Sequence, residues 1–302
     1  MLPHVAVCLL VLAVPIASWS YKGDDGPQHW AGHFPTCAHH HQSPINIPLK
    51  KGLHHDTSLG HLDFHGYASN VALKLWNNGH TAKIVIDGNA SVSGGGLPHG
   101  GKYWASQIHF HWGKDDKMGS EHAVNENKMP LEMHVVHYNS KYENISVAMH
   151  EPDGLAVLAF FGEIVEHDNE GFAALISALQ KVKNAHDGQQ LPNSTLLSGF
   201  MPKEHNKFIR YKGSLTTPPC SESVTWSIFT DHILLSKSQV AEFRKLYVTD
   251  STGDHLVDNF RPLQQLHERH VTTNFKPSEN SATALAPLYA LVAFSIGLKV
   301  WV

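Results

Sequence analysis

The chain has 302 residues, enough to bury a substantial core in one large domain or two small ones, which excludes a peptide or mini-protein. Lys and Arg total 23 against 27 for Asp and Glu, and this formal charge of -4, without a long basic run, argues against nucleic acid as a partner. Hydrophobic residues make up 42% and charged residues 17%, a balance typical of a folded globule and too apolar for a disordered chain.

The chain begins with an apolar run, VAVCLLVLAVPIA at residues 5–17, which is followed by the small residues Ser18 and Ser20. A run of this length before small residues is typical of a secretory signal peptide, here residues 1–18. The alternative interpretation is a buried N-terminal strand. We therefore expect a protein of the secretory pathway.

The cysteines support secretion. Cys8 falls within the predicted signal peptide, which leaves Cys37 and Cys220 as an even pair in an oxidising compartment. We expect them to form one disulfide, with two buried free thiols as the alternative. Glycosylation sequons, which fit the same compartment, begin at Asn89, Asn144 and Asn193.

Between about residues 21 and 276 the sequence shows no low-complexity linker, repeat or long heptad run, so it predicts a single domain. Short apolar or alternating runs separated by Gly, Pro, Asn and Asp turns predict one large sheet. These runs are residues 71–76, 82–86, 106–112, 131–138, 155–161 and 224–229. Residues 172–182 and 237–247 have helical spacing, and we expect both helices on the outside of the sheet.

Histidine is unusually abundant, with 25 residues, which raises the expectation of metal or proton chemistry without locating it. His39 and His41 lie in the tract HHHQ, which has no strand pattern and is more typical of a solvated loop.

The run SQIHFHW is different, because alternation directs Gln107, His109 and His111 to one face of a strand. In LEMHVVHY the same alternation pairs Glu132 with His134, and a neighbouring strand in register would complete a three-histidine site. Three imidazoles with an open fourth position are typical of catalytic zinc, and Gln107 and Glu132 are candidates to fix the ring orientations. Buried histidines hydrogen-bonded within a polar core are the alternative.

At the C-terminus, small polar residues that include Asn280 precede an apolar tail from Leu285 to Val302. This pattern favours a GPI-attachment signal, with Asn280 or a neighbouring serine as the attachment residue. A retained tail anchor and a tail packed into the globule are the alternatives.

Over about residues 19–276 the chain contains, in order, the motifs GPQHW, QSPINI, WNNGH, QIHFHW, GSEH, LEMHVVH, YKGSLTTPP and VDNFRP. Together these motifs resemble those of the α-carbonic anhydrases, and the predicted ends resemble the GPI-anchored, extracellular branch of that family. The resemblance implies an α+β, mainly β fold: a single catalytic domain, residues 19–276, with a large twisted, mostly antiparallel central sheet and peripheral helices. Residues 277–302 would then be the GPI-attachment signal or membrane anchor.

The resemblance also implies roles for residues that match the family motifs. His109, His111 and His134 would bind zinc, supported by Gln107, Glu132 and the backbone carbonyl of Asn259. Thr216 would orient the attacking hydroxide while donating a hydrogen bond to Glu121, and His80 would shuttle protons. Tyr21 and Asn78 would order water along the proton path, and Thr217 would help to hold bicarbonate or anionic inhibitors. Lys83 lies at a more variable position. The apolar wall for carbon dioxide would consist of Val136, Val157, Leu215, Val224 and Trp226.

The implied function is zinc-dependent, reversible hydration of carbon dioxide to bicarbonate and a proton. A lipid anchor would hold the protein at the extracellular face of the plasma membrane. Sulfonamides and anions are the implied inhibitors. The alternatives are a catalytically weak or silent binding relative, a mineral-associated scaffold, and an enzyme whose main activity is ester hydrolysis.

Overall fold

The computed structural model describes residues 18–48 and 53–277. Residues 1–17 and 278–302, which hold most of the predicted signal peptide and anchor signal together with Asn280, lie outside the described residues. Among the residues that are described, no helix combines the length and apolar character needed to cross a membrane.

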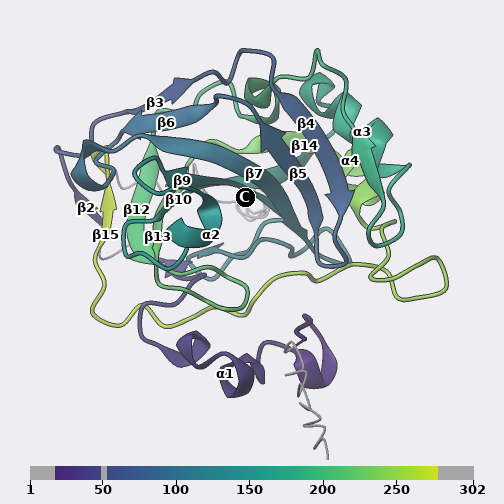
Figure 1. Ribbon diagram of the computed structural model, residues 1–302, viewed down its shortest axis with the longest axis horizontal. Coiled ribbons are helices and arrows are strands. Elements are labelled where there is room, and N and C mark those ends of the chain that lie inside the picture. The colour runs from purple at the N-terminus through teal and green to yellow at the C-terminus, as the bar shows by residue number, and fades with distance from the viewer. Residues whose placement is uncertain (1–17, 49–52, 278–302) are drawn as a thin grey trace, which may run out of the picture.

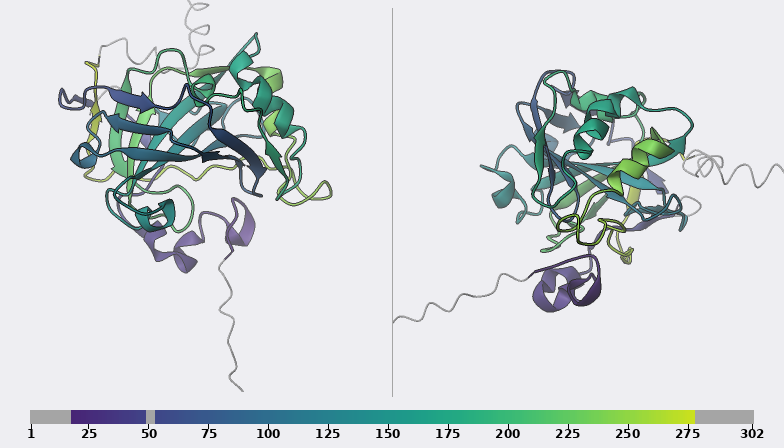
Figure 2. Two further views of the ribbon diagram at one scale, coloured as in Figure 1. Left: turned by 45° about the horizontal axis from the view of Figure 1, so that its top comes forward. Right: turned by 90° about the vertical axis from the view of Figure 1, so that its right-hand side faces the viewer.

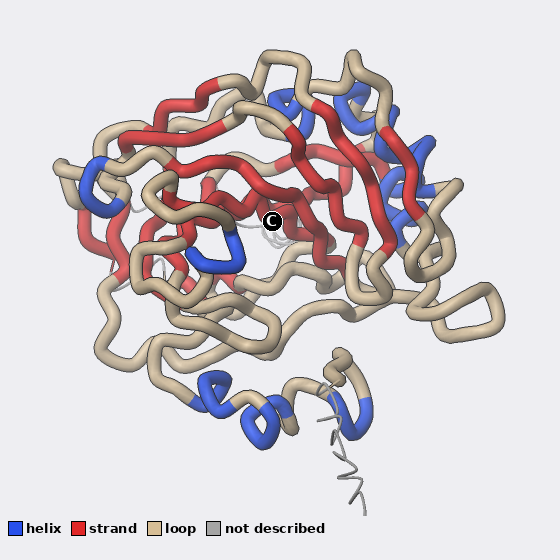
Figure 3. The backbone as a smooth tube through the Cα atoms, viewed as in Figure 1, coloured by secondary structure: helices blue, strands red, loops and turns tan. Residues whose placement is uncertain are grey.

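A large twisted sheet dominates the described part of the chain (Figure 1, and strands in red in Figure 3). Its strands lie in the order β11 (Gly188–Gln190), β4 (Ala72–Asn77), β5 (Ala82–Asp87), β7 (Tyr103–Trp112), β9 (Leu131–Asn139), β10 (Leu155–Val165), β13 (Val224–Phe229), β12 (Phe208–Gly213), β15 (Val271–Thr273) and β2 (Leu53–His55). Three more strands join it: β14 (Ile233–Ser236) pairs with β10, and β6 (Ser91–Gly94) pairs with β7 and with β3 (Leu62–His65). A separate small sheet contains β1 (Asn46–Ile47) and β8 (Ala123–Val124).

Most neighbouring strands of the large sheet are antiparallel, whereas β10–β13, β10–β14 and β15–β2 are parallel. Each run that the sequence predicted as a strand overlaps one of these strands. The prediction of a mainly β fold with a mostly antiparallel sheet is therefore confirmed.

Few helices accompany the sheet, and they lie at its periphery (Figure 3). The α-helices are α1 (Trp30–His33), α2 (Ile145–Ala148), α3 (Ala173–Leu179) and α4 (Lys237–Phe243). The 3₁₀ helices are η1 (Gly23–Asp25), η2 (Pro35–Ala38), η3 (Pro98–Gly100), η4 (Glu170–Phe172) and η5 (Leu197–Phe200).

The helices α3 and α4 correspond to the two predicted helices and lie beside β4 and β14 (Figure 1). Ser236 begins α4 with a capping box, in which its hydroxyl accepts from the backbone N–H of Gln239 and the Gln239 side chain accepts from the N–H of Ser236. Both helices end three or four residues earlier than predicted, at Leu179 and Phe243. Beyond these ends, the backbone N–H groups of Lys181 and Leu246 bond to the carbonyl three residues earlier, as in a 3₁₀ turn.

The strand β10 shows why its sequence is a continuous apolar run. Ala156, Leu158 and Phe160 belong to one hydrophobic cluster, whereas alternate residues such as Val157 and Phe161 belong to another. Because successive side chains of a strand point to opposite faces, the sheet carries an apolar core on each face. The second of these cores reaches the candidate site.

The N-terminal segment with η1, α1 and η2 lies to one side of the sheet (Figure 2). Cys37 in this segment forms a disulfide with Cys220, as the sequence predicted. Arg261 ties the same region together, since its guanidinium donates to the carbonyls of Cys37 and Ser43. The sequon asparagines Asn89, Asn144 and Asn193 are all exposed.

Candidate active site

Strands β7 and β9 bring the predicted histidines together. In their antiparallel register His109 lies directly opposite His134, and His111 lies opposite Glu132. A β-bulge between Ala105 and Gln107 sets this register, after which alternate residues of both strands share one face. Strand pairing therefore produces the three-histidine cluster.

The three rings direct one nitrogen each toward a common point. His134 Nδ1 lies 3.1 Å from His111 Nε2 and 3.2 Å from His109 Nε2. Tetrahedral zinc with bonds of about 2.0–2.1 Å requires about 3.4 Å between ligand nitrogens, so a small expansion would accommodate the ion. Burial, followed by the neighbouring imidazoles His134 and His111, holds the pKa of His109 well below its ordinary value. Burial also lowers the pKa of His111, so both rings favour the neutral form that binds metal.

The outer nitrogens of two of these rings have partners. His111 Nδ1 lies 2.7 Å from the carbonyl oxygen of Asn259, and His134 Nε2 lies 2.6 Å from Glu132 Oε1. Such contacts fix the tautomer and the orientation of a ligand histidine. His109 Nδ1 is buried without a hydrogen-bond partner, and Gln107 lines the cavity without bonding to it. Two of the three expected supports are therefore in place.

A second group of possible ligands, His122, Glu132 and His134, has ligand atoms within 4.8 Å of one another. Here the contacts form a hydrogen-bond network, because Glu132 Oε1 lies 2.7 Å from His122 Nδ1 and Oε2 accepts the backbone N–H of His122 at 2.9 Å. His122 Nε2 lies 2.7 Å from the hydroxyl of Tyr211. Burial alone would raise the pKa of Glu132, but the facing imidazoles of His122 and His134 hold this pKa well below its ordinary value. Within this network the ionised carboxylate of Glu132 holds the ring of His134 in place for the three-histidine cluster.

A cavity of about 280 Å³ opens onto the histidine cluster. Its polar side contains Lys83, Gln107, His109, His134, Thr216 and Thr217. Its apolar side contains Val136, Leu155, Val157, Leu215 and Trp226, together with Ile145 and Met149 at α2. Of the residues expected in the substrate pocket, only Val224 does not line this cavity; it is buried on β13, two residues before Trp226. Burial lowers the pKa of Lys83.

Glu121 and Thr216 are both close to the site. Glu121 is completely buried, its Oε1 accepts the backbone N–H of Arg261 at 2.8 Å, and its Oε2 lies 3.4 Å from His111 Nε2. Thr216 lines the cavity and is 5% exposed. Among the contacts of the described residues there is no hydrogen bond between Thr216 and Glu121.

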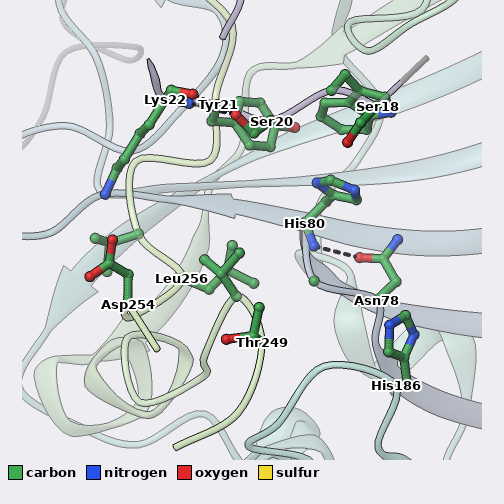
Figure 4. A pocket seen from close by; sticks show the side chains of 14 residues that line it. Ser18, Ser20, Tyr21, Lys22, Asn78, His80, His186, Thr249, Asp254 and Leu256 are labelled. Carbon is green, nitrogen blue, oxygen red and sulfur yellow. Dashed lines mark hydrogen bonds between the residues drawn. The ribbon is translucent and has the colours of Figure 1, made fainter. Parts of the chain in front are cut away.

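The residues expected on the proton path line a neighbouring cavity, and Asn259, whose carbonyl contacts His111, donates its side-chain N–H to the carbonyl of His80 at 3.0 Å. His80, Tyr21 and Asn78 line a separate cavity of about 520 Å³, shown in Figure 4, and none of them lines the cavity at the histidine cluster. Asn78 Oδ1 accepts the backbone N–H of His80 at 3.0 Å. The His80 ring stacks on Trp19, with 3.9 Å between ring centroids. Burial and then the charge of His186 lower the pKa of His80.

Sequence reasoning missed His122, Tyr211, Trp19 and His186. The only sequence signal for His122 was its place after Glu121 in the motif GSEH. This motif lies outside the strands whose alternation located the other histidines. His186 has a left-handed backbone with φ of 70°, and neither its spacing nor its neighbours indicate that it shares a cavity with His80.

Comparison with known proteins identifies close similarities. A family model described as eukaryotic-type carbonic anhydrase matches residues 25–275. Carbonic anhydrase 15 of Mus musculus is 34% identical, with 97% of this chain and 96% of the relative covered. Carbonic anhydrase 4 of Oryctolagus cuniculus is 38% identical, with 82% and 79% covered. Carbonic anhydrase 6 of Homo sapiens is 35% identical, with 87% and 85% covered.

Proposed function

Because the chain belongs to the eukaryotic-type carbonic anhydrases, we propose that it catalyses zinc-dependent, reversible hydration of carbon dioxide at the outer face of the plasma membrane. The observation that carries this proposal is the convergence of His109 Nε2, His111 Nε2 and His134 Nδ1 at the end of a cavity. A silent binding module would have no need of three imidazoles that converge on one point.

The histidine cluster would hold zinc, and the surrounding residues would fix its ligands. When bound, zinc lowers the pKa of water to about 7 and so supplies a hydroxide nucleophile, a value for which carbonic anhydrase itself is the standard example. The carbonyl of Asn259 and the carboxylate of Glu132 keep His111 and His134 in the tautomers that direct a free nitrogen inward.

The cavity walls would position the substrate. Carbon dioxide has no net charge or dipole, so an apolar wall holds it by weak contacts while excluding water. Val136, Val157 and Trp226 provide such a wall beside the histidines. On the polar side, Thr216 and Thr217 offer hydroxyl groups that orient an attacking oxygen and hold the bicarbonate product.

His80 would carry the proton that each hydration releases. A group with a pKa of about 7 loses protons to bulk water at only about 10³ per second, given a diffusion limit of about 10¹⁰ M⁻¹s⁻¹. A nearby acceptor must therefore take the proton if turnover is to be faster. Because its pKa is lowered, His80 is neutral near pH 7 and ready to accept.

The location at the cell surface is supported by the two ends of the sequence, by the disulfide Cys37–Cys220 and by the exposed sequon asparagines. Treatment of expressing cells with phosphatidylinositol-specific phospholipase C should release the protein into the medium. Retention on the cells after treatment would favour a tail anchor instead.

The activity is tested by stopped-flow hydration of carbon dioxide with the purified protein, before and after zinc removal by a chelator, with metal content quantified. We expect fast hydration that is lost with zinc and returns when zinc is restored. A protein that contains one zinc per chain and does not accelerate hydration would overturn the proposal. The ratio of carbon dioxide hydration to hydrolysis of an activated ester distinguishes the main activity from a side reaction.

A further inference from the structure

Lys83 is a cation in the wall of the catalytic cavity. It lies on β5, where the register places it opposite His109 of β7 on one side and Trp76 of β4 on the other. Cross-strand partners share a face of the sheet, so the Lys83 side chain extends over the face that carries the histidine cluster. The lining of the cavity includes Lys83 together with His109 and Thr217.

The charge of Lys83 has no compensating group within residues 18–48 and 53–277. No acidic side chain there pairs with it, and no acceptor takes a hydrogen bond from it, although the side chain is half-buried. Lys128, the other half-buried lysine near the site, donates to the carbonyls of Ser120 and Glu121 at 2.7 and 3.2 Å. A partly desolvated cation without a partner favours an anion supplied from outside.

The titratable groups that face Lys83 do not supply that anion. His109 and His134 are imidazoles of the histidine cluster. The carboxylates Glu121 and Glu132 are completely buried: Glu121 Oε1 accepts the backbone N–H of Arg261, and Glu132 Oε1 lies against the rings of His122 and His134. Neither carboxylate pairs with Lys83 among the described residues, so an anion would reach the ammonium from the open side of the cavity.

Resting on the proposed function, we infer that Lys83 makes this cavity selective for anions: it attracts the bicarbonate product and favours inhibitors that carry a second, negatively charged group. The ligand class is small carbonate or carboxylate oxyanions. An ion pair at a partly exposed site contributes little to the free energy of binding, but the low dielectric of a cavity strengthens the attraction between the two charges. We therefore expect a preference of about threefold to tenfold for a charged over a neutral ligand of the same shape.

The test uses pairs of benzenesulfonamides that differ only in a para substituent, a carboxylate or the matching carboxamide, attached directly or through one or two methylene groups. Calorimetry with the zinc-loaded full-length protein gives the dissociation constant of each compound at low and high salt. We expect the wild type to prefer at least one carboxylate over its amide, and this preference to weaken at high salt.

The variants separate charge from shape. Lys83→Met and Lys83→Gln should bind the amides as the wild type does but lose the preference for carboxylates, whereas Lys83→Arg should keep it. Lys74→Met removes an exposed lysine of β4 that lies over Trp76, and it should leave the preference unchanged.

Binding of the amides reports that each variant is folded and loaded with zinc. The inference is overturned if the wild type binds carboxylate and amide equally at every length, or if Lys83→Met retains the preference. If the zinc-loaded wild type binds none of the sulfonamides, the inference fails, whereas the proposed function is judged separately by the hydration of carbon dioxide.

Discussion

At the scale of single residues, the three candidate ligands are not equivalent. His134 directs Nδ1 inward because Glu132 occupies its Nε2, whereas His109 and His111 use Nε2. A shorter side chain at His109 cannot reach the common point of the three nitrogens. Loss of a ligand and loss of its support should therefore differ in magnitude.

We expect Glu132→Gln to weaken zinc binding by about 10-fold to 100-fold, the usual cost of losing a group that supports a ligand. His109→Asn should weaken it further, because one of three ligands is lost. Competition with a chromogenic chelator measures both, and His65→Asn on β3 is a matched surface control. Equal zinc affinities for His109→Asn and the wild type would contradict the assignment.

His80 should affect proton export and not the attack on carbon dioxide, because it does not line the cavity at the histidine cluster. We expect His80→Ala to lower kcat for hydration by about 10-fold to 100-fold while kcat/KM stays unchanged. Added imidazole buffer should restore much of the loss. A variant with normal kcat in dilute buffer would show that protons leave by another route.

His186 should tune His80 through its charge. Because burial and His186 lower the pKa of His80 below its ordinary value of 6.5, NMR titration should give a midpoint below 6.5. Removal of a nearby positive charge stabilises the imidazolium, so His186→Gln should raise that midpoint toward 6.5. His167→Gln, at another exposed histidine, should not change it, and an unchanged midpoint in His186→Gln would contradict the coupling.

At the scale of elements, strand alternation accounts for most of what the sequence could predict. The period of two in β7 and β9 placed the histidines on shared faces, and the register then set His109 opposite His134. The β-bulge near Gln107 has no comparable signal, since it depends on pairing with a distant strand. Edge strands such as β2 and β11 have three residues each, too few to show a period.

Helix α4 begins with a capping box formed by Ser236 and Gln239, a feature that the helical spacing of residues 237–247 did not indicate. We expect Ser236→Ala to lower the free energy of unfolding by about 1 kcal/mol, because the N–H of Gln239 loses its acceptor. Urea unfolding measures the change, and Ser69→Ala, at an exposed turn, is the control. Equal midpoints for Ser236→Ala and the wild type would show that this cap contributes nothing to stability.

At the scale of the whole molecule, one covalent bond joins the N-terminal segment to the loop before β13. The disulfide closes a separation of 183 residues between Cys37 and Cys220. On the chain-entropy estimate, its loss in Cys37→Ser/Cys220→Ser should lower the free energy of unfolding by about 5 kcal/mol. Denaturant unfolding with and without reductant measures this, and reductant should change only the wild type. A double variant as stable as the wild type would contradict the estimate.

The arrangement of cavities was beyond the sequence. The family resemblance implied that His80, Tyr21 and Asn78 share a proton path, but only the packed chain shows that they line a cavity next to that of Thr216 and the histidine cluster. Likewise, the role of Lys83 follows from its cross-strand neighbour and its missing partner, neither of which a single sequence contains. A role that depends on contacts between residues far apart in the sequence can be recognised only from the tertiary structure.

The apolar wall of the cavity at the histidine cluster is also part of the protein's interior. Val136, Val157 and Trp226 line the cavity and belong at the same time to the hydrophobic cluster on that face of the sheet. A substitution that enlarges the cavity for a bulkier substrate therefore also removes packing from the folded state. A variant with a larger cavity would therefore need compensating packing elsewhere in the fold to keep its stability.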